Sequence, residues 1–295
     1  MSRNLQQILR SFLPNFGLRI RHVEQKRRLE VRFREHLGLI ARGAKGYEPQ
    51  YVSVFRKLLT PGAIVFDVGA NIGFYTVLFS AWVGLHGRVV AFEPDPANLK
   101  SLRRNLKLNE CENVVVSPVA LSNRSGIEPF SVDPVTRLTG HLGKGATYGS
   151  TIFGTGKEDL ISVVTSTLDD EMGKFGVPDL IKMDIEGGEH NALEGGVELL
   201  QRNRPLIVSE LNLWSMDQPI STDKAIQTIR LLADFNYSLW DLDTGLRLGP
   251  NSTPWMFLAV PQEKEDEAQI SQLFGGAKDN FSDGATLQAP IRSEC

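Results

Sequence analysis

One stretch of the sequence decides the fold: Ala63-Ile64-Val65-Phe66-Asp67-Val68-Gly69-Ala70-Asn71-Ile72-Gly73. Its first half is a nearly continuous apolar run, which is typical of a parallel strand buried on both faces. Gly69 and Gly73 let the backbone turn sharply and approach a ligand, because glycine has no Cβ. An apolar helix follows from Gly73 to Val83. A strand, a glycine turn and a helix in this order predict a ligand site at the carboxyl end of the strand.

The same alternation of short apolar runs and helical segments continues along the chain. We expect parallel strands at Ala63–Val68, Val89–Glu93, Val114–Val119, Leu180–Asp184 and Leu206–Glu210, and further helices at Pro96–Asn109, Gly188–Asn203 and Thr222–Phe235. Two last strands, Tyr237–Leu242 and Trp255–Val260, leave little room for a helix between them and indicate an antiparallel hairpin. The sequence therefore predicts an α/β fold: a Rossmann-like, doubly wound, seven-stranded and mostly parallel sheet, closed by a terminal antiparallel hairpin.

Three regions fall outside this alternation. Residues 1–45 are expected to be mostly helix, with a break at Pro14 and a charged helix from about His22 to Leu39. Residues 124–167 predict two extra strands, Ile127–Val132 and Ile161–Thr167, around a mobile Gly-rich loop. We expect an N-terminal basic helical segment at 1–50, a main domain at 51–262 and a polar, flexible tail at 263–295.

Charge is unevenly distributed along the chain. The net charge is −3, whereas residues 1–50 hold eleven basic and four acidic side chains and the remainder is strongly acidic. This pattern indicates a separate element rather than nucleic-acid binding by the whole chain. The element is either a helical cap on the main domain or a basic surface for a phosphate-bearing carrier, a lipid headgroup or an acidic partner protein.

Cysteine content and hydropathy indicate the compartment. Cys111 and Cys295 are too few and too badly placed for a disulfide framework, so a reducing, cytoplasmic location is expected. The apolar runs all fall short of the roughly 20 residues that span a bilayer, and we expect neither a transmembrane segment nor a secretion signal.

The turn after the first strand disfavours a dinucleotide. The dinucleotide fingerprint needs glycines where this chain has Asn71 and Phe74. Asp67, before the turn, can accept a hydrogen bond from an ammonium group. Glu93, 20 residues after Gly73 at the tip of the second strand, can accept hydrogen bonds from two ribose hydroxyls. These residues predict a cofactor that has a ribose and an amino-acid end.

Over about residues 60–215 the chain resembles the FkbM-type methyltransferase family. The motifs that carry the resemblance are Phe66-Asp67-Val68-Gly69-Ala70-Asn71-Ile72-Gly73-Phe74-Tyr75-Thr76, Ala91-Phe92-Glu93-Pro94, Ala120-Leu121-Ser122, Thr167-Leu168-Asp169, Ile181-Lys182-Met183-Asp184-Ile185-Glu186-Gly187-Gly188-Glu189 and Ser209-Glu210. Gly188 and His190 differ from the residues that the family usually has after the acidic motif. The resemblance implies S-adenosylmethionine as cofactor and O-methylation of sugars, polyketides or related natural products. We expect the cofactor to be bound by Asp67, Gly69, Asn71, Gly73, Glu93, Ala120 and Asp184.

A second group of acids is expected beside the transferred methyl group. Asp184 and Glu210 end the fourth and fifth strands, and Glu186 and Glu189 open the following loop and helix. A hydroxyl acceptor benefits from a base or a metal that lowers its pKa. We predict Asp184, Glu210 and Glu186 as catalytic residues and His141 as a further candidate base.

Several alternatives stay open for these residues. We favour direct acid–base action over Mg²⁺ held by Asp184 and Glu210, and no Cys/His grouping suggests zinc. Glu186 and Glu189 can instead cap a helix. Lys182, on an otherwise apolar strand, is expected to pair with a buried acid as a structural element.

The predicted acceptor is a small molecule with a hydroxyl group, either free or linked to a carrier or a lipid, and not a nucleic acid. The alternatives are an amine, a carboxylate or a carrier- or protein-bound acceptor, and an inactive binding module. The joint presence of acids at 67, 93, 184 and 210 argues against an inactive module.

Overall fold

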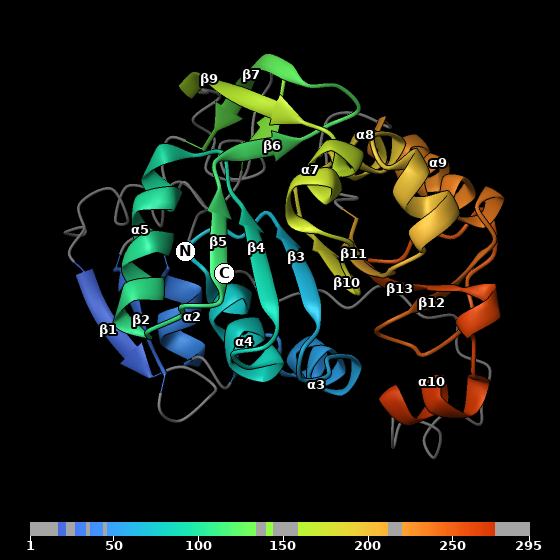
Figure 1. Cartoon of the computed structure of the whole chain (residues 1–295), viewed down its shortest axis with the longest axis horizontal. Helices are drawn as coiled ribbons and strands as arrows, with labels where there is room; N and C mark the ends of the chain where they lie inside the picture. The colour runs from blue at the N-terminus through green and yellow to red at the C-terminus, as the bar shows by residue number, and fades with distance from the viewer. Residues whose placement is uncertain are drawn as a thin grey trace, which may run out of the picture.

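A seven-stranded sheet forms the centre of the molecule (Figure 1). The computed structural model describes residues 17–21, 27–33, 36–43, 46–133, 140–143, 159–211 and 220–274. The strand order is β12-β13-β11-β10-β3-β4-β5, with β3 at Ile64–Val68, β4 at Arg88–Phe92, β5 at Val114–Ser117, β10 at Leu180–Met183, β11 at Leu206–Glu210, β12 at Tyr237–Asp241 and β13 at Met256–Pro261. Only β13 runs antiparallel to its neighbours in this sheet. The predicted Rossmann-like sheet and its terminal hairpin are confirmed.

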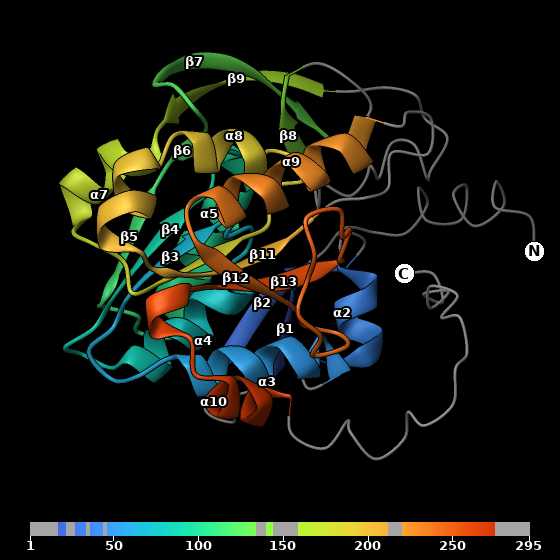
Figure 2. The ribbon, with the colours of Figure 1, turned by 90° about the vertical axis from the view of Figure 1, so that its right-hand side faces the viewer.

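Helices cover both faces of this sheet (Figure 2). One face carries α3 (Pro49–Leu58), α4 (Phe74–Val83) and α5 (Pro96–Leu108), and the other carries α7 (Leu168–Phe175), α8 (Glu189–Glu194), the π-helical turn η2 (Leu199–Asn203) and α9 (Ile220–Asp234). Because both faces are covered, most strand residues are apolar, without the alternation of a half-exposed sheet.

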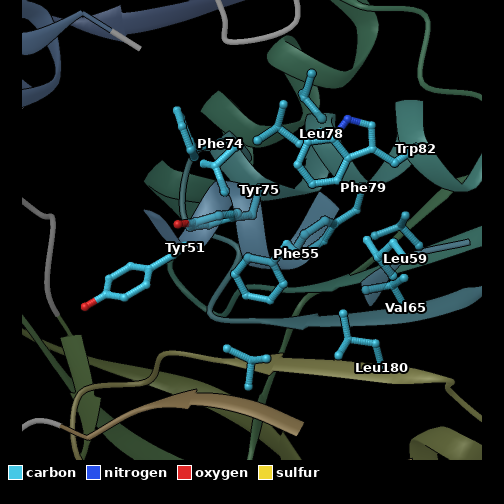
Figure 3. Packing of buried hydrophobic residues seen from close by; sticks show 14 of the residues in the cluster. Tyr51, Phe55, Leu59, Val65, Phe74, Tyr75, Leu78, Phe79, Trp82 and Leu180 are labelled. Carbon is cyan, nitrogen blue, oxygen red and sulfur yellow. The ribbon is translucent and has the colours of Figure 1, made fainter. Parts of the chain in front are cut away.

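Helix α4 is apolar on all sides because protein surrounds it. Figure 3 shows Phe79 and Tyr75 of α4 packed against Phe55 of α3. The ring centroids of Phe55 and Phe79 are 5.1 Å apart, as are those of Phe55 and Tyr75. Trp82 and Leu78 continue the same buried layer. This packing fixes the helix that starts directly after the glycine turn.

A smaller sheet lies above the carboxyl ends of the central strands (Figure 2). Its order is β6-β9-β7-β8, with β6 at Val119–Leu121, β7 at Gly126–Val132, β8 at Gly140–Leu142 and β9 at Asp159–Ser166. The two predicted extra strands are therefore confirmed. The predicted strand Val114–Val119 is wrong in its length, because Pro118 separates β5 from β6 and the two belong to different sheets.

Two further predictions of local structure are corrected. The helix expected at Gly188–Asn203 is interrupted at Gly195, where a Cβ would overlap the carbonyl oxygen of Ser122. The tail expected at 263–295 begins within a 3-10 turn, η3 (Gln262–Lys264), and continues into the helix α10 (Glu267–Leu273). The rest of that tail lies outside the described residues.

The charged helix expected from about His22 to Leu39 is wrong. The chain forms an antiparallel hairpin of β1 (Gly17–Arg21) and β2 (Arg28–Arg32), followed by a short helix α2 (Leu37–Arg42). Leu29 and Val31 alternate with charged residues and are buried, which is the period of a strand and not of a helix. The hairpin lies beside α5 (Figure 1). The helix and the break expected before residue 17 fall outside the described residues.

Across the part of the chain that the structure describes, no helix combines the length and the apolar character needed to cross a membrane.

Candidate active site

A cavity lies where the carboxyl ends of β3 and β4 meet the small sheet. Its floor is formed by the turn after β3 and by the end of β4, and its roof by β6, β7 and β8. The lining residues are Val68, Gly69, Asn71, Phe92, Glu93, Pro94, Asp95, Asn98, Val119, Ala120, Leu121, Phe130, Val132, Gly140, Leu142, Asp184, Ile185, Glu186 and Gly188. The position agrees with the ligand crevice expected for an open α/β sheet.

Backbone contacts hold the turn after β3 in place. The amides of Gly69 and Ala70 both donate to the carbonyl oxygen of Phe92, each at 3.0 Å. Asn71 has a positive φ of 50°, and its amide donates to Glu93. Gly69 has a φ of 77°, and a Cβ there would overlap the carbonyl oxygen of Asp184. A glycine is therefore required at position 69, and the turn is packed directly against the loop that carries Asp184.

Glu93 places a buried carboxylate at the edge of the cavity. Its Oε2 accepts from the amide of Asn71 at 2.8 Å and its Oε1 from the amide of Asp95 at 2.9 Å. The side chain is only 5% exposed. Burial raises the pKa of Glu93 to about 7, although the hydrogen bonds from the two amides and from Asn98 act in the opposite direction. The carboxylate is thus fixed in orientation and titrates near neutrality.

Asp67 lies beneath the cavity and does not line it. It is fully buried, its Oδ2 accepts from the hydroxyl of Thr76 at 2.6 Å, and its Oδ1 lies 3.4 Å from Lys182 Nζ. Lys182 also donates to the carbonyl oxygen of Gly69 at 3.2 Å. Asp67 therefore supports the turn through Lys182, and this position does not favour the direct contact with the cofactor that the sequence suggested.

Lys182 is the centre of a buried charged group. Its Nζ lies 3.7 Å from Asp184 Oδ2 and 5.4 Å from the centroid of the Tyr75 ring. The Tyr75 hydroxyl in turn donates to Glu48 at 2.6 Å. Burial alone would lower the pKa of Lys182, but the carboxylates of Asp67 and Asp184 outweigh it and the net shift is upward. Lys182 pairs with a buried acid, as expected, and links that acid to Asp184.

Only part of the second group of acids lies at the cavity. Asp184 and Glu186 both line the cavity, and the Asp184 side chain is 37% exposed. Glu189 turns away: it is buried, and its Oε1 accepts from the amides of Ile185 at 3.1 Å and Gly187 at 3.2 Å. Burial raises the pKa of Glu189 to about 7. Glu189 therefore stabilises the loop, which agrees with its alternative reading as a capping residue.

Glu210 ends β11, the strand next to β10, but it is not among the residues that line the cavity. Within the described ranges, no three His, Cys, Asp or Glu side chains form a group that could hold a metal ion. Mg²⁺ held by Asp184 and Glu210 stays a prediction.

Comparison with known proteins gives the family. The model of the methyltransferase FkbM domain matches residues 67–239, more than half of the chain. The chain belongs to the FkbM methyltransferase family.

Two curated relatives of this family member have names that describe their reactions. The 2-O-methyltransferase NoeI of Sinorhizobium fredii is 29% identical over 52% of this chain and 65% of its own length. The hexuronic acid methyltransferase AglP of Haloferax volcanii is 30% identical over 49% of this chain and 54% of its own length. The chain thus spans less than two thirds of each relative. A crystal structure of an FkbM methyltransferase from Methylobacillus flagellatus is 20% identical, with a TM-score of 0.43, and covers 67% of this chain and 43% of that one.

The other predicted site residues of this FkbM protein differ in their positions. Ala120 lines the cavity, whereas Gly73 starts α4 beneath it. His141 lies in β8 and not in a loop, and its neighbours Gly140 and Leu142 line the cavity. Because successive side chains of a strand point to opposite faces, His141 points away from the cavity, which disfavours its role as a base. The remainder of the Gly-rich loop lies outside the described residues.

Sequence reasoning missed three contributors to this FkbM site. Asn98 lines the cavity from the first turn of α5 and hydrogen-bonds to Glu93. Phe130 and Leu142 form part of the roof. The signal for Asn98 is its place five residues after the strand-ending carboxylate Glu93 and three residues after the helix cap Asp95. The roof residues had none, because their strands are far from the turn in sequence.

Proposed function

We propose that this chain is an S-adenosylmethionine-dependent O-methyltransferase that methylates a hydroxyl group of a sugar. Membership of the FkbM family supports the reaction class. The single observation that carries the proposal is Glu93, a buried carboxylate oriented by two backbone amides at the edge of the cavity.

The residues of the cavity fit the cofactor. When bound, S-adenosylmethionine supplies an electrophilic methyl group. The Glu93 carboxylate has about four acceptor positions; the amides of Asn71 and Asp95 and the side chain of Asn98 use three, so one remains for a ribose hydroxyl. The apolar wall of Val119, Ala120 and Leu121 suits the adenine ring. Gly69 lines the cavity at the turn, where the amino-acid end of the cofactor would lie.

Asp184 is the residue we propose as general base. It lines the cavity with a partly exposed carboxylate, and Lys182 fixes one of its oxygens from below at 3.7 Å. A carboxylate held in this way can take the proton of an acceptor hydroxyl while the reacting atoms are kept in line. Glu210, at the end of the neighbouring strand, is the second candidate, for the base or for Mg²⁺ with Asp184.

The names of the two relatives support this acceptor: the 2-O-methyltransferase supports transfer to an oxygen, and the hexuronic acid methyltransferase supports a sugar. The surface of α5 supports a sugar linked to a phosphate-bearing carrier. Lys100, Arg103, Arg104 and Lys107 are exposed at helical spacing on one side of α5, next to Arg28 of the hairpin. Arg104 is ion-paired with Glu30 at 2.6 Å, and the other four cations form a surface that attracts phosphate.

Two measurements test the proposed activity. S-adenosylhomocysteine is titrated by calorimetry into the wild-type protein and into Glu93→Ala, and a panel of free sugars and sugars on pyrophosphate carriers is incubated with labelled S-adenosylmethionine. We expect binding by the wild type, weaker binding by Glu93→Ala, and an O-methyl sugar identified by mass spectrometry. Absence of binding in the folded wild-type protein would overturn the cofactor assignment. Transfer to amines or carboxylates but not to hydroxyls would overturn the acceptor class.

The basic surface has its own test. The triple variant K100E/R103E/K107E is expected to raise KM for a carrier-linked acceptor at physiological salt and to leave KM for the free sugar unchanged. The matched control is K224E/R230E, which reverses two exposed charges on α9, at the opposite face of the sheet. Equal effects of the two variants, or no effect of the first, would refute the carrier proposal.

A further inference from the structure

The outer edge of the N-terminal hairpin is covered by two asparagines of α5. Asn109 accepts from the amide of Arg28 at 2.9 Å and donates to its carbonyl oxygen at 2.7 Å. Asn105 does the same for Glu30, at 2.7 Å and 3.1 Å. The outward backbone groups of β2, which would otherwise be an open strand edge, are thus paired by side-chain amides.

The spacing of these residues explains the fit. Residues 105 and 109 are four apart on a helix and rise by about 6 Å, while residues 28 and 30 are two apart on a strand and rise by roughly 6.6 Å. Outward-facing backbone groups recur at every second strand residue, so one asparagine per helical turn meets each of them. An asparagine amide carries both a donor and an acceptor and so imitates the missing neighbouring strand.

Asn105 differs from Asn109 in one contact. Its Nδ2 also donates to the carbonyl oxygen of Ile72 at 2.8 Å, and the side chain is fully buried. Ile72 belongs to the turn after β3, between Asn71, which is held by Glu93, and Gly73, which starts α4. One hydrogen of the buried Asn105 amide therefore goes to the hairpin. The other goes to the turn of residues 69–73, which we call the cofactor turn. The second bond of Asn109 Nδ2 goes instead to the carbonyl oxygen of Asn105, within the same helix.

We propose that Asn105 is a positioning residue for the cofactor, and that through it the hairpin of residues 17–32 fixes the cofactor turn. The inference rests on the proposed function, because it assumes that this turn binds the cofactor. Phe92 and Glu93 hold the start of the turn and Lys182 holds it from below. Asn105 holds the carbonyl oxygen of Ile72 through a buried hydrogen bond, so loss of the donor leaves a buried acceptor unsatisfied.

The hairpin is therefore not independent of the main domain, because Asn105 links it to the cofactor turn. If the hairpin shifts, the Glu30 backbone groups shift with it, and Asn105 must either follow them or stay with Ile72. A displaced hairpin therefore disturbs the cofactor turn without touching the cofactor. Removal of the hairpin leaves the Asn105 amide half-paired in a buried position, which costs stability and orientation together.

The test compares Asn105→Ala with Asn109→Ala, its matched control. Both variants lose hydrogen bonds to β2, and both are expected to lower the melting temperature. Only Asn105→Ala is expected to weaken S-adenosylhomocysteine binding, by about tenfold in Kd, and to raise KM for S-adenosylmethionine more than it lowers kcat. If Asn105→Ala does not fold, Asn105→Ser replaces it, since its hydroxyl can keep one of the bonds.

A second readout separates this inference from the proposed function. Amide hydrogen exchange of residues 69–74, measured in the free protein, is expected to accelerate in Asn105→Ala and to stay at the wild-type rate in Asn109→Ala. A wild type that binds no S-adenosylhomocysteine would overturn the proposed function, while the exchange rates would still decide whether Asn105 fixes the turn. Equal losses of affinity in the two variants, or unchanged exchange in Asn105→Ala, would overturn the inference.

Discussion

The cofactor affinity of this protein should depend on pH through Glu93. Burial raises the pKa of this carboxyl group to about 7. Because the folded-state pKa lies above the ordinary value of an acid, the neutral form dominates below pH 7 and the carboxylate above it. The Glu93 carboxylate keeps one acceptor position for a ribose hydroxyl, whereas a neutral carboxyl group loses one acceptor site to its own proton. Affinity is therefore expected to rise with pH and not to fall.

The size of the effect follows from the pKa. With a pKa of about 7, roughly a tenth of the Glu93 side chains are ionised at pH 6 and roughly nine tenths at pH 8. If only the carboxylate binds the ribose, the Kd of S-adenosylhomocysteine falls about tenfold between these two pH values. Glu93→Gln keeps the shape of the side chain but cannot ionise. Its Kd is expected to be about 10- to 100-fold weaker at pH 8, from the loss of charged hydrogen bonds, and to change little with pH.

Calorimetric titration at pH 6, 7 and 8 measures the dependence in both proteins. Glu189→Gln is the matched control, because Glu189 is also buried with a pKa raised to about 7 but does not line the cavity. This control is expected to keep the wild-type slope of Kd against pH, whatever its absolute affinity. A flat wild-type profile, or a slope that persists in Glu93→Gln and disappears in Glu189→Gln, would show that the reasoning about Glu93 is wrong.

Four further outcomes are expected. Asp184→Asn lowers kcat by at least about 100-fold, as expected for loss of a general base, and changes S-adenosylhomocysteine affinity little. Unchanged turnover would show that Asp184 is not the base. Glu210 would then be tested in the same way by Glu210→Gln. EDTA changes the rate by less than about twofold if the carboxylate acts directly, and abolition of activity with recovery on Mg²⁺ addition would make the acids metal ligands. Lys182→Met lowers the free energy of unfolding in urea by about 3–5 kcal/mol, because it leaves Asp67 as an unpaired buried charge. A decrease of less than about 1 kcal/mol would contradict the pairing of Lys182 with Asp67. Leu29→Ala costs about 2–5 kcal/mol, since Leu29 is fully buried, and a cost near zero would show that the hairpin is a detachable appendage.

The sequence predicts the central sheet well because the physics of buried parallel strands is local. Five short apolar runs, such as Ile64–Val68 and Leu206–Glu210, can be read without knowing their neighbours. The turn at Gly69 and the position of Glu93 follow from the same strand ends. The hairpin was also readable, because Leu29 and Val31 alternate with charged residues. The high density of charge in residues 22–39 favours a helix, whereas the two-residue repeat of buried positions indicates a strand.

Other features depend on contacts between segments that are far apart in sequence. The role of Asn105 requires knowledge that β2 lies against α5, 75 residues away. Similarly, the pairing of Lys182 with Asp67 rather than with Asp184 alone follows from the register of β10 on β3. The orientation of His141 depends on its pairing with Ser131 in the small sheet. None of these can be derived from spacing along the chain.

The place of β13 has a consequence for synthesis of the protein. Of the described strands, β13 is the last to leave the ribosome, yet it lies between β11 and β12 and is the only described strand that pairs with β12. Until residues 256–261 emerge, β12 has no partner, and the edge of β11 stays open to other chains. We expect nascent chains that stop after β12 to be cleaved readily between β11 and β12, and chains extended past β13 to resist. The sheet edge at Glu210 would then be completed only once β13 has emerged, because Met256 of β13 pairs with Glu210.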